Sequence, residues 1–452
     1  MSNFRDVERQ TGFLLPPSVD EWLPERHLAR FVVEVIEGLD LSAMVKAYRG
    51  SGSASYHPGM LLGLLIYGYA TGVFSSRKLE RATYDSVAFR FIAANDHPDH
   101  DTIAAFRRRF LKQIEKLFVE VLLVAREAGV LKLGTVALDG TKVHANASRH
   151  SALSYEHAGR IEAQLKGEVA ELMALAETTD TADVPDGMSV PEELALRAQR
   201  LARIAEARAK IEARARIRFE AEQAAYEAKM AERAAREKAT GKKPGGKPPV
   251  PPTPGPRPKD QVNLTDEDSR IMPVAGGGFE QAYNAQAAVA AGSMLVLTND
   301  VVQAANDKEQ IDPTLARLAA LPGRLGEPGT LLADSGYYSE ANVKACARVK
   351  IAPLIAPGRE RHHRSWKDRF AEAPPEPVKP TALQAMLHRL ATPEGRKAYA
   401  LRKQTPEPVF GIIKSVMGFR QFSLRGLQKV KGEWNLVTMA WNIKRMFVLT
   451  SP

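Results

Sequence analysis

One long segment limits what this chain can fold into. Residues 191–240 are rich in Ala, Glu, Arg and Lys, and their larger apolar residues recur at a rough heptad spacing, at Leu194, Leu201, Ile204, Ile211 and Ile217. This pattern predicts a long, largely exposed helix that pairs with a helix over 156–177 as an antiparallel hairpin. Residues 241–260 are rich in Pro, Gly and Lys and predict a disordered or polyproline linker. Neither piece suits a central sheet, so we expect an insertion over 152–260.

The chain before this insertion is predicted to be helical. Apolar residues with helical periodicity occur at 28–36, 60–69, 87–92 and 103–124, and Pro58 after His57 is a favourable helix start. Basic residues gather in this part, at Arg77, Lys78, Arg81 and Arg107 to Arg109. A basic helical part suits DNA binding, although small helices with basic faces also occur elsewhere. We expect residues 1–128 to form a helical N-terminal DNA-binding domain.

From Thr135 onward the periodicity changes. Strands are predicted at 135–144, 285–290, 294–300, 330–334 and 351–355, and helices at 307–320 and 340–349. Strands that alternate with helices indicate a mixed α/β sheet. We therefore expect an α/β domain over 129–452. It is interrupted by the helical insertion and by a second, small basic insertion over 357–392.

Charge and cysteine content narrow the class of protein. The net charge of +10 and the pI of about 9.5 favour a polyanionic partner, most commonly nucleic acid, although ribosome-associated and membrane-surface proteins share this excess. The single cysteine, Cys346, excludes an intrachain disulfide and a thiolate zinc site, and it fits a reducing compartment. No apolar run approaches the roughly 20 residues of a membrane span. We expect a cytoplasmic protein that does not enter a membrane.

Two acidic residues end predicted strands. Asp139 is followed by Gly-Thr-Lys and Asp334 by Ser-Gly, and both sequences are also typical of plain turns. If the two strands are neighbours, their carboxylates lie side by side, because adjacent strands run about 4.8 Å apart. Like charges that close are costly unless a cation lies between them. Asp266 and Asp268 are alternative ligands, but they follow the linker and are typical of turn or N-cap residues.

A third acid begins a helix near the C-terminus. Thr405 is predicted as its N-cap and Pro406 as its first residue, which puts Glu407 in the first turn. Lys414 returns to nearly the same face after about two turns, and Gly411 between them leaves room for a bulky group. One interpretation is that Glu407 only complements the helix macrodipole and Lys414 is solvated. The other is that Glu407 joins the two aspartates in binding Mg²⁺, which prefers oxygen ligands.

The whole set of motifs resembles bacterial insertion-sequence transposases of the DDE class, whose catalytic domain is RNase H-like. The segments that carry the resemblance cover most of the chain outside the insertions: 137–146, 263–272, 283–287, 332–339, 407–414 and 418–426, with Glu433, Trp434, Asn442, His57-Pro58 and Tyr67-Gly-Tyr. The resemblance implies an RNase H-like catalytic domain over 129–452. It also implies that Asp139, Asp334 and Glu407 are the catalytic triad that binds two Mg²⁺ ions, for which Mn²⁺ substitutes.

The resemblance further implies a group of DNA-contacting residues around Glu407, namely Tyr399, Arg402 and Lys414. Four residues separate Arg402 from Glu407, one more than in the family pattern, so Lys403 is an alternative to Arg402. We also expect Lys142, close behind Asp139, to contact DNA.

The second insertion contains further candidates. Trp366 is expected at the DNA, stacked on a flipped base, although such a residue also packs the core of a small insertion. His362 and His363 lie among several arginines, which leaves open a metal pair, a DNA-backbone patch or a solvated face.

The implied function is that of a DNA transposase. It binds the terminal inverted repeats of its element through the N-terminal helices, hydrolyses the phosphodiester at each end, and joins the 3′-hydroxyls to target DNA. Two DNA ends must be held together, so we expect a homo-oligomer on double-stranded DNA. Two alternatives remain open: an RNase H-like nuclease that cuts without joining, and a non-enzymatic DNA-binding protein derived from a transposase.

Overall fold

The chain divides into two compact units. The computed structural model describes residues 18–48, 55–178, 188–243, 245–274, 276–358, 374–375 and 377–450. One unit comprises Met1–Asn146 and Met272–Pro452, and the other comprises Ala147–Ile271. The N-terminal helices thus belong to the same compact unit as the sheet. A separate DNA-binding domain over 1–128 stays a prediction.

The N-terminal part of the first unit is helical, as expected. Its helices are α1 (Val19–Trp22), α2 (Leu28–Glu37), α3 (Ser42–Val45), α4 (Pro58–Thr71), α5 (Ser76–Asp85), α6 (Val87–Ile92) and α7 (His100–Glu127). Helix α4 starts at Pro58, and His57 Nδ1 accepts a hydrogen bond from the Gly59 amide at 3.1 Å. The basic cluster divides: Arg77, Lys78 and Arg81 are exposed, whereas Arg107 is buried.

A mixed sheet forms the centre of the same unit. Its strands are β1 (Thr135–His144), β4 (Arg270–Pro273), β5 (Phe279–Ala290), β6 (Val296–Val302), β7 (Thr330–Ala333) and β8 (Ala352–Ile355). The order is β4-β5-β1-β7-β8, with β6 also paired to β5. Strand β1 is antiparallel to β5 and parallel to β7, and β7 is parallel to β8. The expected mixed α/β fold is confirmed, and all five predicted strands are present.

Helices surround the sheet in the C-terminal half. They are α10 (Ile311–Ala319), α11 (Glu340–Arg348), α13 (Ala382–Ala391), α14 (Pro393–Ala400), α15 (Pro406–Ser415) and α16 (Leu427–Thr450), with 3-10 turns η2 (Gly323–Leu325), η3 (Ser335–Tyr337) and η4 (Leu401–Gln404). Ser339 caps α11 as expected.

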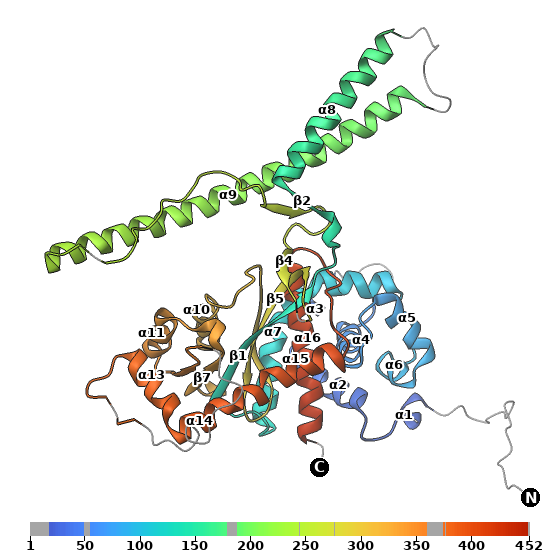
Figure 1. The fold of residues 1–452 in the computed structure, drawn as a ribbon. Helices are drawn as coiled ribbons and strands as arrows, with labels where there is room; N and C mark the ends of the chain where they lie inside the picture. Colours follow the sequence, from blue (N-terminus) through green and yellow to red (C-terminus); the bar gives the residue numbers. More distant parts are fainter. Residues whose placement is uncertain are drawn as a thin grey trace, which may run out of the picture. The chain divides into compact units, whose positions relative to one another are not determined.

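Helix α16 joins the sheet to the N-terminal helices, because it packs against β6 on one side and against α4 and α7 on the other (Figure 1). Trp434 Nε1 donates to the Gln286 carbonyl oxygen of β5 at 3.1 Å. The Asn442 side chain accepts from the Val296 amide and donates to the Val296 carbonyl oxygen, both at 2.8 Å. A buried amide that pairs with strand backbone in this way satisfies polar groups that would otherwise destabilise the core.

The second unit is a helical hairpin on a two-stranded base. It contains η1 (Arg149–Ser151), β2 (Ala152–Ser154), α8 (Tyr155–Thr178), α9 (Val190–Thr240) and β3 (Gln261–Asn263). Strands β2 and β3 pair antiparallel, with Leu153 opposite Val262. Helices α8 and α9 are antiparallel, since Glu162 pairs with Arg208 and Glu168 with Arg197. The predicted hairpin is confirmed.

Only part of α9 has a hydrophobic core. Ile204, Ala207 and Ile211 pack with Leu153, Ala158, Leu165 and Val262. Ile217, the last residue of the predicted heptad pattern, is 67% exposed. The residues after α9 were expected to be disordered or polyproline. Those described here form neither helix nor strand until β3, but they are tied to α9, because Arg257 pairs with Glu222 at 2.9 Å and Arg218 with Asp260 at 2.8 Å.

No single helix in the described parts of the chain is long and apolar enough to cross a membrane. Helices α4 and α5 satisfy length and composition criteria only as a pair, and they are bent by 95° relative to each other. Most of α4 is buried among the other helices of its unit, as expected of a core helix.

Candidate active site

The sheet places Asp139 and Asp334 next to each other. Strands β1 and β7 are parallel, and Ala137 pairs with Leu332. Asp139 lies two residues after Ala137, and Asp334 lies two residues after Leu332. Both aspartates therefore reach the same level on neighbouring strands, which run about 4.8 Å apart. Asp139 Oδ1 accepts from the Gly140 amide, and Asp334 Oδ1 accepts from the Gly336 amide, each at 2.8 Å. The predicted juxtaposition of the first two acids is present.

Asp139 lies in an environment that disfavours its charge. The pKa of this carboxyl is raised to about 7, mainly by burial and also by the charges of Asp334 and Asp307, while the Gly140 amide and Arg402 act to lower it. Two more carboxylates close to a buried one make this a place where a cation is electrostatically favoured.

Arg402 is the cation that lies among these acids. Its Nη2 contacts Glu407 Oε1 at 3.0 Å, and its side chain is only 12% exposed. Burial acts to lower the pKa of the guanidinium, yet the pKa is raised overall by four neighbours: Tyr399, Glu407, Asp139 and Asp334. Arg402 is one residue farther from Glu407 in sequence than the family pattern expects, yet its side chain still lies among the acids. Arg402 thus links Glu407 electrostatically to the two aspartates.

Helix α15 carries Glu407 and packs against β1. Pro406 is its first residue and Thr405 its N-cap residue, as predicted, but the Thr405 hydroxyl makes no capping bond and instead donates to the Leu401 carbonyl oxygen at 2.7 Å. A Cβ added at Gly411 would meet no atom within 4 Å, in agreement with the open space expected there.

The two predicted lysines lie together at the end of β1. Lys414 Nζ donates to Thr141 Oγ1 at 2.5 Å and to the Lys142 carbonyl oxygen at 2.7 Å. Burial lowers the pKa of Lys414, and the charges of Lys142 and Arg420 lower it further. Lys142 Nζ lies 3.8 Å from Asp307 Oδ1. Lys142 thus lies beside the acids, and Lys414, next to Lys142, anchors α15 to β1.

A polar network on β5 was not predicted as part of the site. Asp307 Oδ1 accepts from Asn284 Nδ2 and from Gln286 Nε2, both at 2.7 Å, and the Tyr337 hydroxyl donates to Gln286 Oε1 at 2.6 Å. Asn284 and Gln286 are buried on a strand that is otherwise mostly apolar. Two polar residues spaced by two on such a strand face the same side. That spacing is the sequence signal that could have identified Asn284 and Gln286 as site residues. Asp307 lies in the loop after β6 and has no such signal.

The three predicted metal ligands do not form a metal-binding group here. Among the described residues, no cluster of three or more His, Cys, Asp or Glu side chains is placed to hold a metal ion. Asp139 and Asp334 fit a divalent cation, because their carboxylates are neighbouring hard oxygen donors and two negative charges cannot neutralise each other. Glu407 is paired with Arg402 in this arrangement. Its role as a metal ligand stays a prediction.

Tyr399 lies beside Arg402, whose pKa it acts to raise. Tyr399 packs against the small core of Ala137, Leu332 and Leu354. Trp366, His362 and His363 are outside the described residues. The alternative ligands Asp266 and Asp268 belong to the insertion unit.

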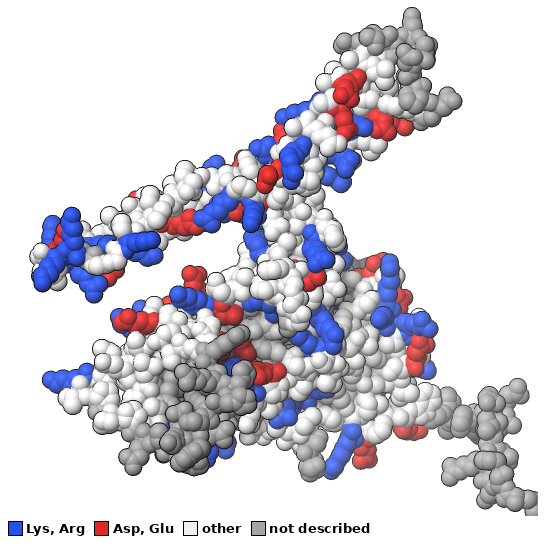
Figure 2. All heavy atoms as spheres, viewed as in Figure 1, with Lys and Arg blue, Asp and Glu red and all other residues white. Residues whose placement is uncertain are grey.

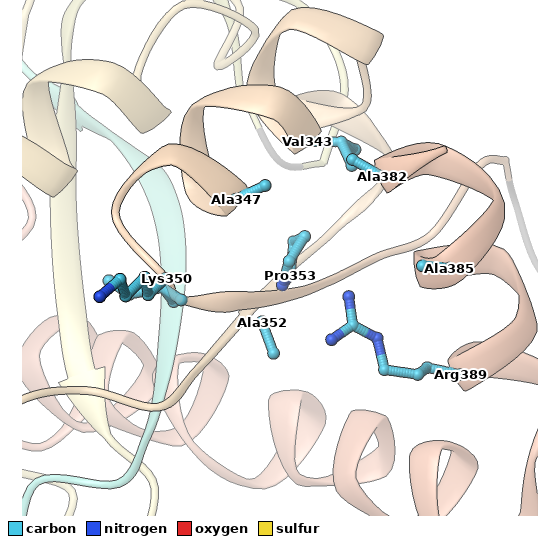
Figure 3. A pocket seen from close by; sticks show the side chains of 9 residues that line it. Val343, Ala347, Lys350, Ala352, Pro353, Ala382, Ala385 and Arg389 are labelled. Atoms are coloured by element: carbon cyan, nitrogen blue, oxygen red, sulfur yellow. The ribbon is translucent and has the colours of Figure 1, made fainter. Parts of the chain in front are cut away.

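A cavity of about 270 Å³ lies between α11, β8 and α13 (Figure 3). Its walls are mainly small or apolar, and Figure 3 shows the Arg389 guanidinium close to Ala352 and Pro353. Burial lowers the pKa of Arg389. None of the lining residues belongs to the predicted site.

Two family models match the chain. One is described as a transposase domain (DUF772) and matches residues 17–109; the other is described as a transposase DDE domain and matches residues 360–447. The second range contains Glu407, Arg402 and Lys414 but neither aspartate. No curated protein and no solved structure matches the chain. The two matches, one over the N-terminal helices and one over α13 to α16, are both to transposase domains and support an insertion-sequence transposase of the DDE class.

Proposed function

We propose that this transposase cuts the ends of a mobile element and joins them to target DNA. The observation that supports this proposal is the pair Asp139 and Asp334 at the ends of neighbouring parallel strands, with Arg402 and Glu407 beside them. We also infer that the sheet is the RNase H-like core that the resemblance implies, since one edge (β1, β5, β6) is antiparallel and the other (β1, β7, β8) is parallel.

The acids would hold divalent metal ions, which this family generally uses. We propose Mg²⁺, for which Mn²⁺ would substitute. Asp139 and Asp334 would hold such an ion, and Glu407 would join them if its ion pair with Arg402 opened. A bound ion supplies Lewis-acid assistance to displacement at phosphorus. Released from Glu407, Arg402 is free to hold a phosphate oxygen, which a guanidinium does well.

The DNA chemistry then needs no covalent protein intermediate. Water attacks the phosphorus at the element's end, forming one P–O bond while the P–O3′ bond breaks and leaves a 3′-hydroxyl. That hydroxyl attacks a target phosphodiester, and the target strand's own 3′-oxygen leaves. Lys142, beside Asp307, and Lys414, next to Lys142, would contact phosphate oxygens. Tyr399 would steady the DNA from α14, and the N-terminal helices would recognise the inverted repeats.

The triad is tested by isosteric substitution. Asp139→Asn, Asp334→Asn and Glu407→Gln are each expected to abolish Mg²⁺-dependent cleavage of a duplex carrying the element's end, with DNA affinity within about threefold, because phosphate contacts dominate affinity. Asp312→Asn, an exposed acid on α10, is the matched control and should cleave normally. Normal cleavage by any of the three variants would remove that residue from the site.

A second assay separates transposase from nuclease. Duplexes with pre-cut 3′-ends are incubated with the protein and a target plasmid, and joined products are measured. Joining that disappears in Asp139→Asn is the expected result. Cleavage of uncut ends without any joining would instead identify a nuclease, and binding without either activity would identify a non-enzymatic protein.

A further inference from the structure

We propose that the far end of the insertion is an arm that binds the DNA backbone independently of sequence. This inference rests on the proposed function and adds a second DNA-contacting surface to it. The surface, called here the basic tip, consists of five residues at and after the end of α9: Arg236, Lys238, Lys242, Lys243 and Lys247.

Helix α9 extends well beyond its hydrophobic core. Its last buried residue is Ala215, and the helix continues to Thr240, which is about 37 Å of further length at 1.5 Å per residue. On this extension Ile217 and Met230 are exposed, and Phe219 and Tyr226 are only half-buried. A helix that is polar all round contributes little to a core of its own. The length of the extension therefore places the basic tip far from the base of the hairpin and does not pack the tip against other residues of the hairpin.

Charge is distributed unevenly along the insertion. Residues 147–220 have eleven lysines and arginines against thirteen aspartates and glutamates, a net charge of −2. Residues 221–259 have nine against four, a net charge of +5, which is half of the +10 of the whole chain. The hairpin near its base thus balances its charge, whereas the distal part concentrates positive charge.

Pairing follows the same division. Near the base, Arg197 pairs with Glu168 and Arg208 with Glu162. At the basic tip every one of the five side chains is exposed, and none forms an ion pair among the described residues. Figure 2 shows several Lys and Arg side chains, with a few acidic ones among them, at the free end of α9. Unpaired, exposed cations are available to an external polyanion without the loss of an existing ion pair.

The helix leading to the tip has four lysines and arginines against four glutamates over residues 221–240, but three of the cations share one face. Lys229, Arg233 and Arg236 recur at intervals of four and three residues, so they lie on one face of α9. The proline-rich return beside the helix adds Lys247 and is tied down by the Arg257–Glu222 pair. A row of cations on a rod matches a row of phosphates along a duplex.

Double-stranded DNA fits this surface better than a second copy of the chain does. A coiled-coil partner needs an apolar seam at a and d positions, and after Ile217 the apolar residues of α9 are mostly alanines. Two tips of equal positive charge also repel each other. Cations without aromatic or base-reading partners favour phosphate contacts, which position DNA without specifying its sequence.

The test neutralises the tip in the full-length protein. Arg236, Lys238, Lys242, Lys243 and Lys247 are all changed to Gln, and binding to a random-sequence duplex is measured by fluorescence anisotropy at several salt concentrations. Affinity should fall at least tenfold, and the slope of log K against log salt should become shallower by up to about 4.5, since each phosphate contact contributes about 0.9.

A matched control should have the opposite effect on DNA affinity. Glu227→Gln, Glu232→Gln and Glu237→Gln remove acids from the same stretch and should tighten binding. Unchanged affinity and slope in both sets would overturn the inference. A tip variant that binds DNA normally but loses self-association in light scattering would overturn it too, by assigning the tip to contacts between copies.

These outcomes are distinguishable from failure of the proposed function. The tip variant retains Asp139, Asp334 and Glu407, so at saturating protein it should still cleave the element's end. Loss of DNA affinity in the tip variant, with no cleavage by any form of the protein, would support the arm and contradict the enzyme. Normal affinity in the tip variant, with cleavage that needs Asp139, would contradict the arm and support the enzyme.

Discussion

Gly140 is the residue on which the packing of the site depends most directly. A Cβ at this position would lie 2.6 Å from Asp307 Oδ1 and 2.9 Å from Asn284 Oδ1, closer than Cβ atoms approach such groups. The network of Asn284, Gln286 and Asp307 therefore fills the space that a side chain would need. Glycine here keeps Asp139 and the network in contact across β1 and β5.

Gly140→Ala is expected to lower the free energy of unfolding by about 1–3 kcal/mol, because the buried amides cannot move without losing their hydrogen bonds. Chemical denaturation measures the change. Gly411→Ala on α15 is the control: its Cβ meets nothing within 4 Å, so it should be neutral or stabilise by up to about 1 kcal/mol. Equal stability of the two variants would contradict this account of Gly140.

The predictability of the site differs from residue to residue for physical reasons. Asp139 and Asp334 were predictable as neighbours because each ends a short apolar strand followed by a turn. The position of Arg402 among the acids was not, since it depends on how η4 turns before α15. Asp307 was missed because a loop residue has no periodicity that marks it.

At the scale of elements, a buried carboxylate connects helices far apart in the chain. Glu433 on α16 accepts from the Tyr69 hydroxyl of α4 and from the amides of Ser423 and Leu424, each at 2.9 Å. Arg107 on α7 donates to Tyr69 at 2.9 Å. Burial, with the charge of Glu433, raises the pKa of Tyr69 far above its usual range, so Tyr69 remains a neutral donor.

Glu433→Gln should lower the free energy of unfolding by about 2–4 kcal/mol, because an amide nitrogen cannot accept the hydrogen bonds that the carboxylate oxygen accepts and the charge near Arg107 is lost. Thermal and urea denaturation are suitable measurements. Glu394→Gln, an exposed first-turn acid on α14, should change stability by less than about 0.5 kcal/mol. A Glu433→Gln protein as stable as that control would show that the network contributes little.

Elements were predicted unevenly as well. Starts marked by a proline or a capping side chain, at Pro58, Ser339 and Pro406, were correct because the local chemistry of a helix end is carried by one or two residues. Strands β2, β3 and β4 were not predicted. With three or four residues each, they are too short to show an alternation, and their pairing depends on contacts distant in sequence.

At the scale of the whole molecule, the insertion unit is expected to be dispensable for folding of the first unit. Strands β2 and β3 bring Ser154 opposite Gln261, so residues 155–260 can be replaced by Asn-Gly, which favours a two-residue hairpin turn. Leu153→Thr and Val262→Thr remove the apolar groups that lose their helical partners. The shortened chain should unfold cooperatively at the temperature of the main transition of the full chain.

Calorimetry of both chains checks this prediction. The full chain should show an additional transition if the hairpin unfolds separately. A shortened chain without a cooperative transition would mean that the first unit requires the insertion. The interruption itself was predictable from composition, since a charged, alanine-rich segment followed by prolines cannot be part of a buried sheet.

The paired base of the insertion also has a consequence for the order of folding. Strands β1 and β5 are neighbours in the sheet, yet the entire insertion separates them along the chain. If the hairpin forms first, β2 and β3 close that long loop before the sheet assembles. The search for the correct β1–β5 register then becomes nearly local, and pairing proceeds faster than the sequence separation suggests. An early-folding hairpin would hold the ends of β1 and β5 close together. The folding rate of the sheet would then not depend on the length of the arm.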